Sequence, residues 1–115
     1  MENSILNSVA DFIGGIESED FETALVVSIN SAFLTLHDLG CGPKTGFRIT
    51  GENEKWTDYE VEEKFLPFVQ NYICLKTKMV FDPPANATVF NAYTAQIAEL
   101  ETRLNWDTDV LNSDA

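Results

Sequence analysis

The stretch from Leu75 to Trp106 constrains the fold more than any other part of the chain, because it contains two helical runs separated by an abrupt stop. The stop is Asp82-Pro83-Pro84. Neither proline has a backbone N–H, and each one pushes the residue before it out of the α region. The sequence therefore predicts two helices joined by a short rigid elbow rather than by a flexible linker.

The spacing of apolar residues along the whole chain predicts four helices. Gly14-Gly15 ends the first of them. Ser18 or Asp20 is expected to cap the second helix, and Asn86 the fourth. The third helix should carry Pro67 at its start, where a proline is well tolerated. The expected spans are residues 4–13, 21–37, 66–80 and 87–104.

The fold class that follows is mainly α, a small bundle of about four helices. Residues 45–56 change character and predict a short β-hairpin or an ordered loop inserted in the bundle. Thr57 and Glu60 fit a capping box that opens the next helical region. We expect residues 1–106 to form a single helical domain, followed by an acidic C-terminal tail over residues 107–115.

The helix expected over residues 21–37 is apolar around most of its circumference. Phe21, Leu25, Ile29, Phe33 and Leu36 share one stripe, but Val26, Val27 and Leu34 lie off it. A helix of this kind is usually central, or contacts more than one neighbour.

The net charge of −12 limits the possible partners of the chain. Affinity for nucleic acid depends on cations that contact phosphates, so tight DNA binding is disfavoured. Three interpretations remain open: an acidic surface that provides solubility, a channel wall past which DNA slides without adhering, and a decoy that imitates DNA.

Several apparent sites lack the pattern that their chemistry needs, so we expect no catalytic residue, no cofactor and no metal. Residues 40–45 superficially resemble a phosphate-binding loop, but Pro43 interrupts the motif and a helix precedes it. His37 and Cys41 have no second pair of zinc ligands. No segment is apolar enough to span a membrane, and the N-terminus lacks the features of a signal peptide. Synthesis in the cytoplasm follows, with Cys41 and Cys74 as reduced thiols.

Charged and aromatic residues suggest where partners bind. Lys76 and Lys78, with Lys64, form a basic segment that could meet an acidic edge of another copy, around residues 17–22 or 52–63. Trp56 and Trp106 are either core residues or interface anchors. The candidate contacts with neighbouring subunits or partner proteins are Phe47, Arg48, Lys55, Trp56, Lys76, Lys78 and Trp106.

The order YICLKTKMVFDPP, then a helix closing on ELETRLNW, resembles the small head–tail connector proteins of long-tailed DNA bacteriophages, also called adaptor or head-completion proteins. The resemblance implies a structural, non-enzymatic virion protein at the neck. Its subunits would form a ring, typically twelve-fold, below the portal protein. The ring would extend the DNA channel without binding DNA specifically, and dock a stopper or tail-completion protein. The residue 45–56 segment and the tail would contact neighbouring rings.

Two other functions stay open from the sequence. The first is a small acidic protein that mimics DNA and inhibits a host DNA-binding protein. The second is a helical interaction module of cellular origin.

Overall fold

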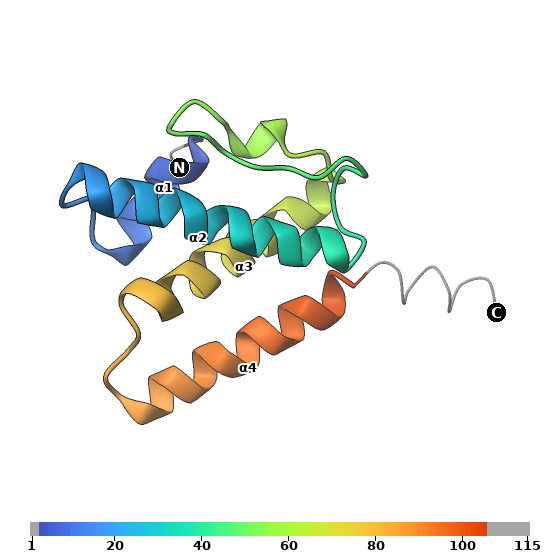
Figure 1. Ribbon diagram of the computed structural model, residues 1–115. Coiled ribbons are helices and arrows are strands. Elements are labelled where there is room, and N and C mark those ends of the chain that lie inside the picture. The colour runs from blue at the N-terminus through green and yellow to red at the C-terminus, as the bar shows by residue number, and fades with distance from the viewer. Residues whose placement is uncertain (1–2, 106–115) are drawn as a thin grey trace.

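The computed structural model describes residues 3–105, which are mainly helical (Figure 1). The helices of this range are α1 (Ile5–Ile13), α2 (Glu19–Asp38), α3 (Leu66–Phe81) and α4 (Ala87–Arg103), with 3₁₀ turns η1 (Trp56–Asp58) and η2 (Glu63–Phe65). No strand forms between residues 3 and 105, so the expected small helical bundle is confirmed, and the segment inserted at residues 45–56 is an ordered loop rather than a hairpin.

The helix ends follow local capping signals. The Ser4 hydroxyl accepts a hydrogen bond from the N–H of Asn7 at 3.3 Å, and Gly14 ends α1 with a left-handed φ of 109°. At the fourth helix, Asn86 Oδ1 accepts from the N–H of Thr88 at 2.8 Å. The predicted helix ends at Gly14 and Asn86 are therefore confirmed, and α1 begins at Ile5, one residue after the predicted start, with Ser4 as its cap.

The second helix begins two residues earlier than the sequence pattern indicated. Of the two candidate caps, Ser18 is the one used, because its hydroxyl accepts from the N–H of Phe21 at 3.1 Å. Glu19 and Asp20 consequently lie inside the first turn of α2, where the helix dipole favours carboxylates.

The elbow between α3 and α4 forms at the predicted position. α3 ends at Phe81, Asp82 caps it, and α4 begins at Ala87, so the two prolines lie in the connection. Figure 1 shows that α4 turns back and runs beside α3. Pro67 lies in the first turn of α3, where its missing N–H costs no intrahelical bond.

The predicted capping box at Thr57 and Glu60 is wrong. Thr57 lies inside the single turn η1 rather than before a helix. The carboxylate that caps this turn belongs to Asp58, whose Oδ2 accepts from the N–H of Lys55 at 2.9 Å. Asp58 therefore provides the capping carboxylate in place of the predicted pair of Thr57 and Glu60.

The loop between α2 and η1 is held by hydrogen bonds to elements distant in sequence. Asn30 on α2 receives the N–H of Ile49 at 2.7 Å and donates to its carbonyl at 2.9 Å. Near its end the loop runs along the start of α1, where the N–H of Ile5 donates to Glu54 O at 3.0 Å. The loop is therefore fixed at both of these points.

We expect Asn30→Ala to lower the free energy of unfolding by about 1–3 kcal/mol, because it leaves the buried N–H and carbonyl of Ile49 without partners. Urea denaturation followed by circular dichroism measures the change. Asn53→Ala, at an exposed position of the same loop, is the matched control and should be neutral. Equal effects of the two substitutions would contradict the assignment.

The core lies between α1, α2 and α3, and α4 packs against it from Tyr93 onwards. Leu104 is fully buried and Leu100 nearly so. Val89 lies on the same face of α4 as Leu100, but Val89 and its neighbour Phe90 are each 39% exposed. The first turn of α4 therefore contributes little to the core.

Candidate functional site

The lysines of α3, predicted as outer contacts, have acidic partners in their own chain. Lys78 Nζ lies 2.9 Å from Asp82 Oδ2, and Lys76 Nζ lies 3.9 Å from Glu101 Oε2. Lys64, which completes the basic segment, lies 3.6 Å from Glu62. The structure therefore presents a basic segment whose charge is largely balanced locally.

Three other cations are placed differently. Lys44, Arg48 and Lys55 lie on the loop that follows α2, and all three are exposed. Within residues 3–105 none of them forms an ion pair. The predicted contacts Arg48 and Lys55 thus lie on one loop, together with a lysine that the sequence analysis did not select.

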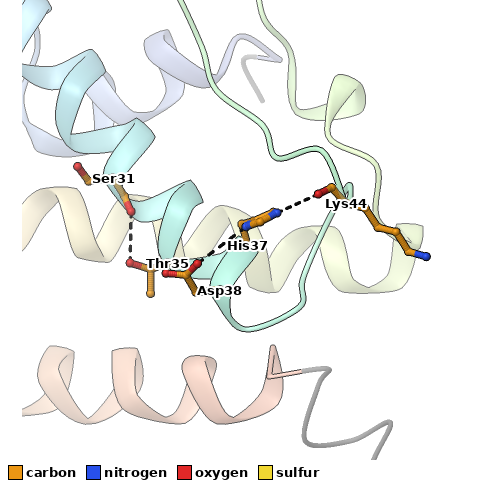
Figure 2. Close-up of polar contacts among 5 residues, drawn as sticks. All are labelled: Ser31, Thr35, His37, Asp38 and Lys44. Atoms are coloured by element: carbon orange, nitrogen blue, oxygen red, sulfur yellow. Dashed lines mark hydrogen bonds and ion pairs between the residues drawn. The ribbon is translucent and has the colours of Figure 1, made fainter.

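His37 fixes the first part of this loop to the end of α2. Its Nε2 lies 3.0 Å from the backbone carbonyl of Lys44, and since a carbonyl only accepts, Nε2 is the donor. Its Nδ1 is 3.9 Å from the carboxylate of Asp38. Figure 2 shows the Lys44 side chain pointing away from His37 and from α2, so the backbone is held while the ammonium faces outward.

Two of the predicted contacts are internal in this structure. The Phe47 ring packs edge-on against Phe33 and Tyr59, with centroid distances of 4.9 and 5.2 Å. Trp56 is 2% exposed, and its Nε1 donates to Ser8 Oγ at 3.0 Å. These aromatic side chains anchor the loop that carries the cations.

The last predicted contact, Trp106, and the acidic tail at residues 107–115 lie outside the described residues.

The second half of α4 is tied to α3 by a polar cluster. Glu101 accepts a hydrogen bond from the hydroxyl of Tyr72 at 2.8 Å and faces Lys76 on the same helix as Tyr72. Arg103 pairs with Glu99 on α4 itself at 3.1 Å and lies over the Phe68 ring of α3. Nearer the elbow, α4 is held to the core by the partly buried Tyr93 and Ile97.

A groove of about 460 Å³ lies between α1, α3 and α4. Asp11 is the one charged residue of its lining, which also includes Phe12, Cys74 and Tyr93. Burial raises the pKa of the Cys74 thiol to about 11, so the thiol is protonated at neutral pH and is a poor nucleophile. The groove therefore offers shape and apolar surface rather than an activated group.

Between residues 3 and 105, no three His, Cys, Asp or Glu side chains lie close enough together to hold a metal ion. None of the helices described is long and apolar enough to cross a membrane.

We expect the free energy of unfolding to be constant up to about pH 9 and to fall at higher pH. Burial raises the pKa of Tyr59 and of Tyr72, which also donates to Glu101, and it raises the pKa of Cys74 from 9.0 to about 11. These groups lose their protons at lower pH in the unfolded chain, so alkali favours unfolding. Urea titrations between pH 7 and pH 11 measure the decline. Cys74→Ala should reduce the decline between pH 9 and 11, to which Cys41 also contributes because burial raises its pKa as well, and an unchanged slope would contradict this assignment.

Several exposed apolar side chains were not among the contacts predicted from the sequence. Val27 and Leu34 on α2 are 62% and 60% exposed, and Val80 at the end of α3 is 66% exposed. A signal was present, because residues 23–36 and 83–98 contain no charged residue in a chain that is 23% charged. Where such a run also exposes apolar side chains, as at Val27 and Leu34, it marks a candidate contact surface.

Comparison with known proteins gave one family match. Residues 5–110 match a family model described as phage connector protein. Neither the curated proteins nor the solved structures contain a match to this chain.

Proposed function

The chain belongs to the phage connector protein family, and from this membership we propose that it is a subunit of a ring, typically twelve-fold, between the portal protein and a stopper or tail-completion protein. The ring extends the DNA channel at the head–tail junction of the virion and performs no chemistry. The single observation that carries this proposal is the family match, which extends from the first residue of α1 past the end of α4.

The loop cations supply the docking surface for a neighbouring ring. This assignment is supported by the exposure of Lys44, Arg48 and Lys55, which lack ion pairs within residues 3–105, and by the hydrogen bonds that fix the loop backbone. Cations carried on a fixed backbone favour binding to an acidic patch on the portal or stopper, because little backbone freedom is lost on binding. Contacts of Lys76 and Lys78 with another copy remain a prediction. Such contacts would require each lysine to leave its acidic partner within the chain and to pair with an acid of the other copy.

The acidic surface acts on the DNA that passes through the ring. A net charge of −12 per subunit repels phosphates, and a ring repeats that charge in every copy. DNA that enters or leaves the head would then slide along the channel wall without adhering. The same surface would interfere with DNA passage if its acids were replaced by lysines.

Deleting the gene from a phage that carries it tests the role directly. We expect DNA-filled heads and free tails to accumulate separately, as seen by electron microscopy, because the docking ring is missing. Complementation with the wild-type chain should restore joined particles. Infectious virions that form normally without this protein would refute the proposal.

Arg48→Glu with Lys55→Glu tests the docking surface. The reversed charges should weaken binding of the ring to its partner, while the fold is kept because both side chains are exposed. Sedimentation of the labelled variant with portal-containing heads measures the loss. Asn53→Glu, at an exposed position of the same loop, is the control for added negative charge.

A further inference from the structure

Two exposed surfaces of this chain are apolar and free of charge, although the chain is strongly acidic. The first, here called the α2 outer face, is one side of α2 between its acidic start and Asp38. The second, here called the elbow surface, flanks the connection between α3 and α4. The α2 outer face consists of Thr23, Ala24, Val27, Ser31 and Leu34, and the elbow surface of Val80, Val89 and Phe90.

The α2 outer face is held in place by the opposite side of the same helix. Leu25, Ile29 and Phe33 are buried in the core, so Val27 and Leu34 cannot turn inward without expelling them. The helix apolar on several sides, noted in the sequence, thus packs on α1 and α3 inside the chain and keeps a further apolar side in water. That further side is suited to a contact with another molecule.

The side chains of the elbow surface are likewise held in exposed positions. Val80 lies on the last turn of α3 and Phe90 on the first turn of α4, on either side of the proline connection. The charges nearest to it in the sequence, Lys78 and Asp82, neutralise each other at 2.9 Å. The surface therefore presents apolar side chains with almost no net charge beside them.

The proposed ring places copies of the chain side by side, and electrostatics favour these two surfaces for the contact between copies. Two copies that each carry −12 repel one another over most of their surfaces, so close approach is least costly where charges are absent. The two charge-free surfaces meet that condition. They also differ in shape, because the small residues Ala24 and Ser31 leave space on α2, whereas Phe90 projects a large ring.

We propose that the elbow surface of each copy packs on the α2 outer face of the next copy. This contact rests on the proposed ring, and names the surfaces that close it. Because the two surfaces lie on different elements, the contact is heterologous, and a heterologous contact continues from copy to copy until the ring closes. Pairing of either surface with itself would instead produce a closed dimer.

The contact should strengthen as salt is added. Salt screens the repulsion between acidic copies, with a Debye length of about 10 Å at 0.1 M, and leaves the apolar contact intact. A contact built on lysines and carboxylates would weaken under the same conditions. Association measured by analytical ultracentrifugation over a range of salt concentrations separates the two cases.

Site-directed cross-linking tests the pairing, even when association is transient. Cys74→Ala removes the partly exposed native thiol, and Cys41 is buried. In this background, copies with Val27→Cys or Leu34→Cys are mixed with copies carrying Phe90→Cys and oxidised. We expect a mixed disulfide to form at least about tenfold faster, for one of the two α2 positions, than with the control Glu60→Cys, because docking raises the local concentration of the thiols.

Three results would overturn the proposal. The mixed disulfides could form no faster than the control, or the α2 variants could cross-link fastest with themselves, or the Phe90→Cys copies could do so. The last two outcomes would establish pairing of like surfaces.

Ring assembly on portal-containing heads gives a second test that separates this contact from the proposed function. Leu34→Lys and Phe90→Glu copies should each fail to form rings, as observed by electron microscopy, while both fold because the positions are exposed. Normal rings from both variants would refute the contact and leave the connector function intact. Absence of wild-type rings from these heads would refute the function itself.

Discussion

Trp56→Ala should destabilise the chain by about 3–5 kcal/mol, the usual cost of removing a large buried aromatic side chain. Trp56 is 2% exposed and lies at the junction of the loop and α1, where its Nε1 donates to Ser8. The backbone N–H of Trp56 also donates to the carbonyl of Asn3 at 2.9 Å. The substitution therefore empties a space in the core and loosens the end of the loop that carries the cations.

Thermal unfolding followed by circular dichroism measures this effect, and the midpoint should fall by about 10–20 °C for a chain of this size. Trp56→Phe is the matched control. It keeps most of the ring volume and loses the hydrogen bond to Ser8, so we expect a smaller loss of about 1–2 kcal/mol. A loss below about 1 kcal/mol for the alanine variant would place Trp56 outside the core.

Gly42→Ala should cost about 2–4 kcal/mol, from a strained backbone together with a steric overlap. Gly42 has a φ of 88°, which is unfavourable for a residue with a Cβ. A Cβ at this position would also lie 2.6 Å from Cζ of Tyr59. Tyr59 is buried, and its ring packs on Phe33 and Phe47, so it has little room to move.

Gly46→Ala isolates the backbone part of this cost. Gly46 has a nearly identical φ of 87°, but the nearest atom to its added Cβ is 3.9 Å away, on His37. We expect a loss of about 1–2 kcal/mol from the left-handed backbone alone. Equal losses of the free energy of unfolding in the two glycine variants, measured by urea denaturation, would show that the Tyr59 side chain moves aside without an energetic cost.

A double variant tests the origin of the overlap. Tyr59→Phe removes the hydroxyl that approaches Gly42 and also donates to Cys41 Sγ at 3.5 Å. If the overlap dominates, Gly42→Ala should be less costly in the Tyr59→Phe background than in the wild type. Strict additivity would assign the whole loss to the backbone.

These substitutions all lie in or beside the loop between α2 and η1. The sequence predicted that a loop or hairpin lies here, but not the path of its backbone. The segment at residues 45–56 has short polar and apolar alternations, which allowed a hairpin. In the structure, its backbone groups bond to Asn30 and to the start of α1 rather than to each other. Partners so far apart in the chain leave no local pattern, so this arrangement could not be predicted from spacing alone.

The candidate site was predicted in part. Arg48 and Lys55 were selected, and both are exposed on the loop. Trp56 had been left open between core and interface, and the structure places it in the core. Lys76 and Lys78 lie on one helix as predicted, but the acids that pair with them come from α4 and the elbow. Only the elbow partner, Asp82, is at the spacing of four residues that a helical pattern reveals.

The sequence by itself determined most of the helix boundaries, although α2 begins two residues before its predicted start. Ser4, Gly14, Asn86 and the two prolines of the elbow act on backbone groups within about four residues, so their effect does not depend on the rest of the fold. The sequence also carries the match to the phage connector family.

Only the tertiary structure decided which apolar residues are buried. Val89 and Leu100 lie on one face of α4, yet Val89 is 39% exposed and Leu100 is buried. Burial depends on which elements pack together, and packing is a sum over contacts between distant parts of the chain. The exposed elbow surface and the exposed loop cations, which form no ion pair within residues 3–105, both arise in that way.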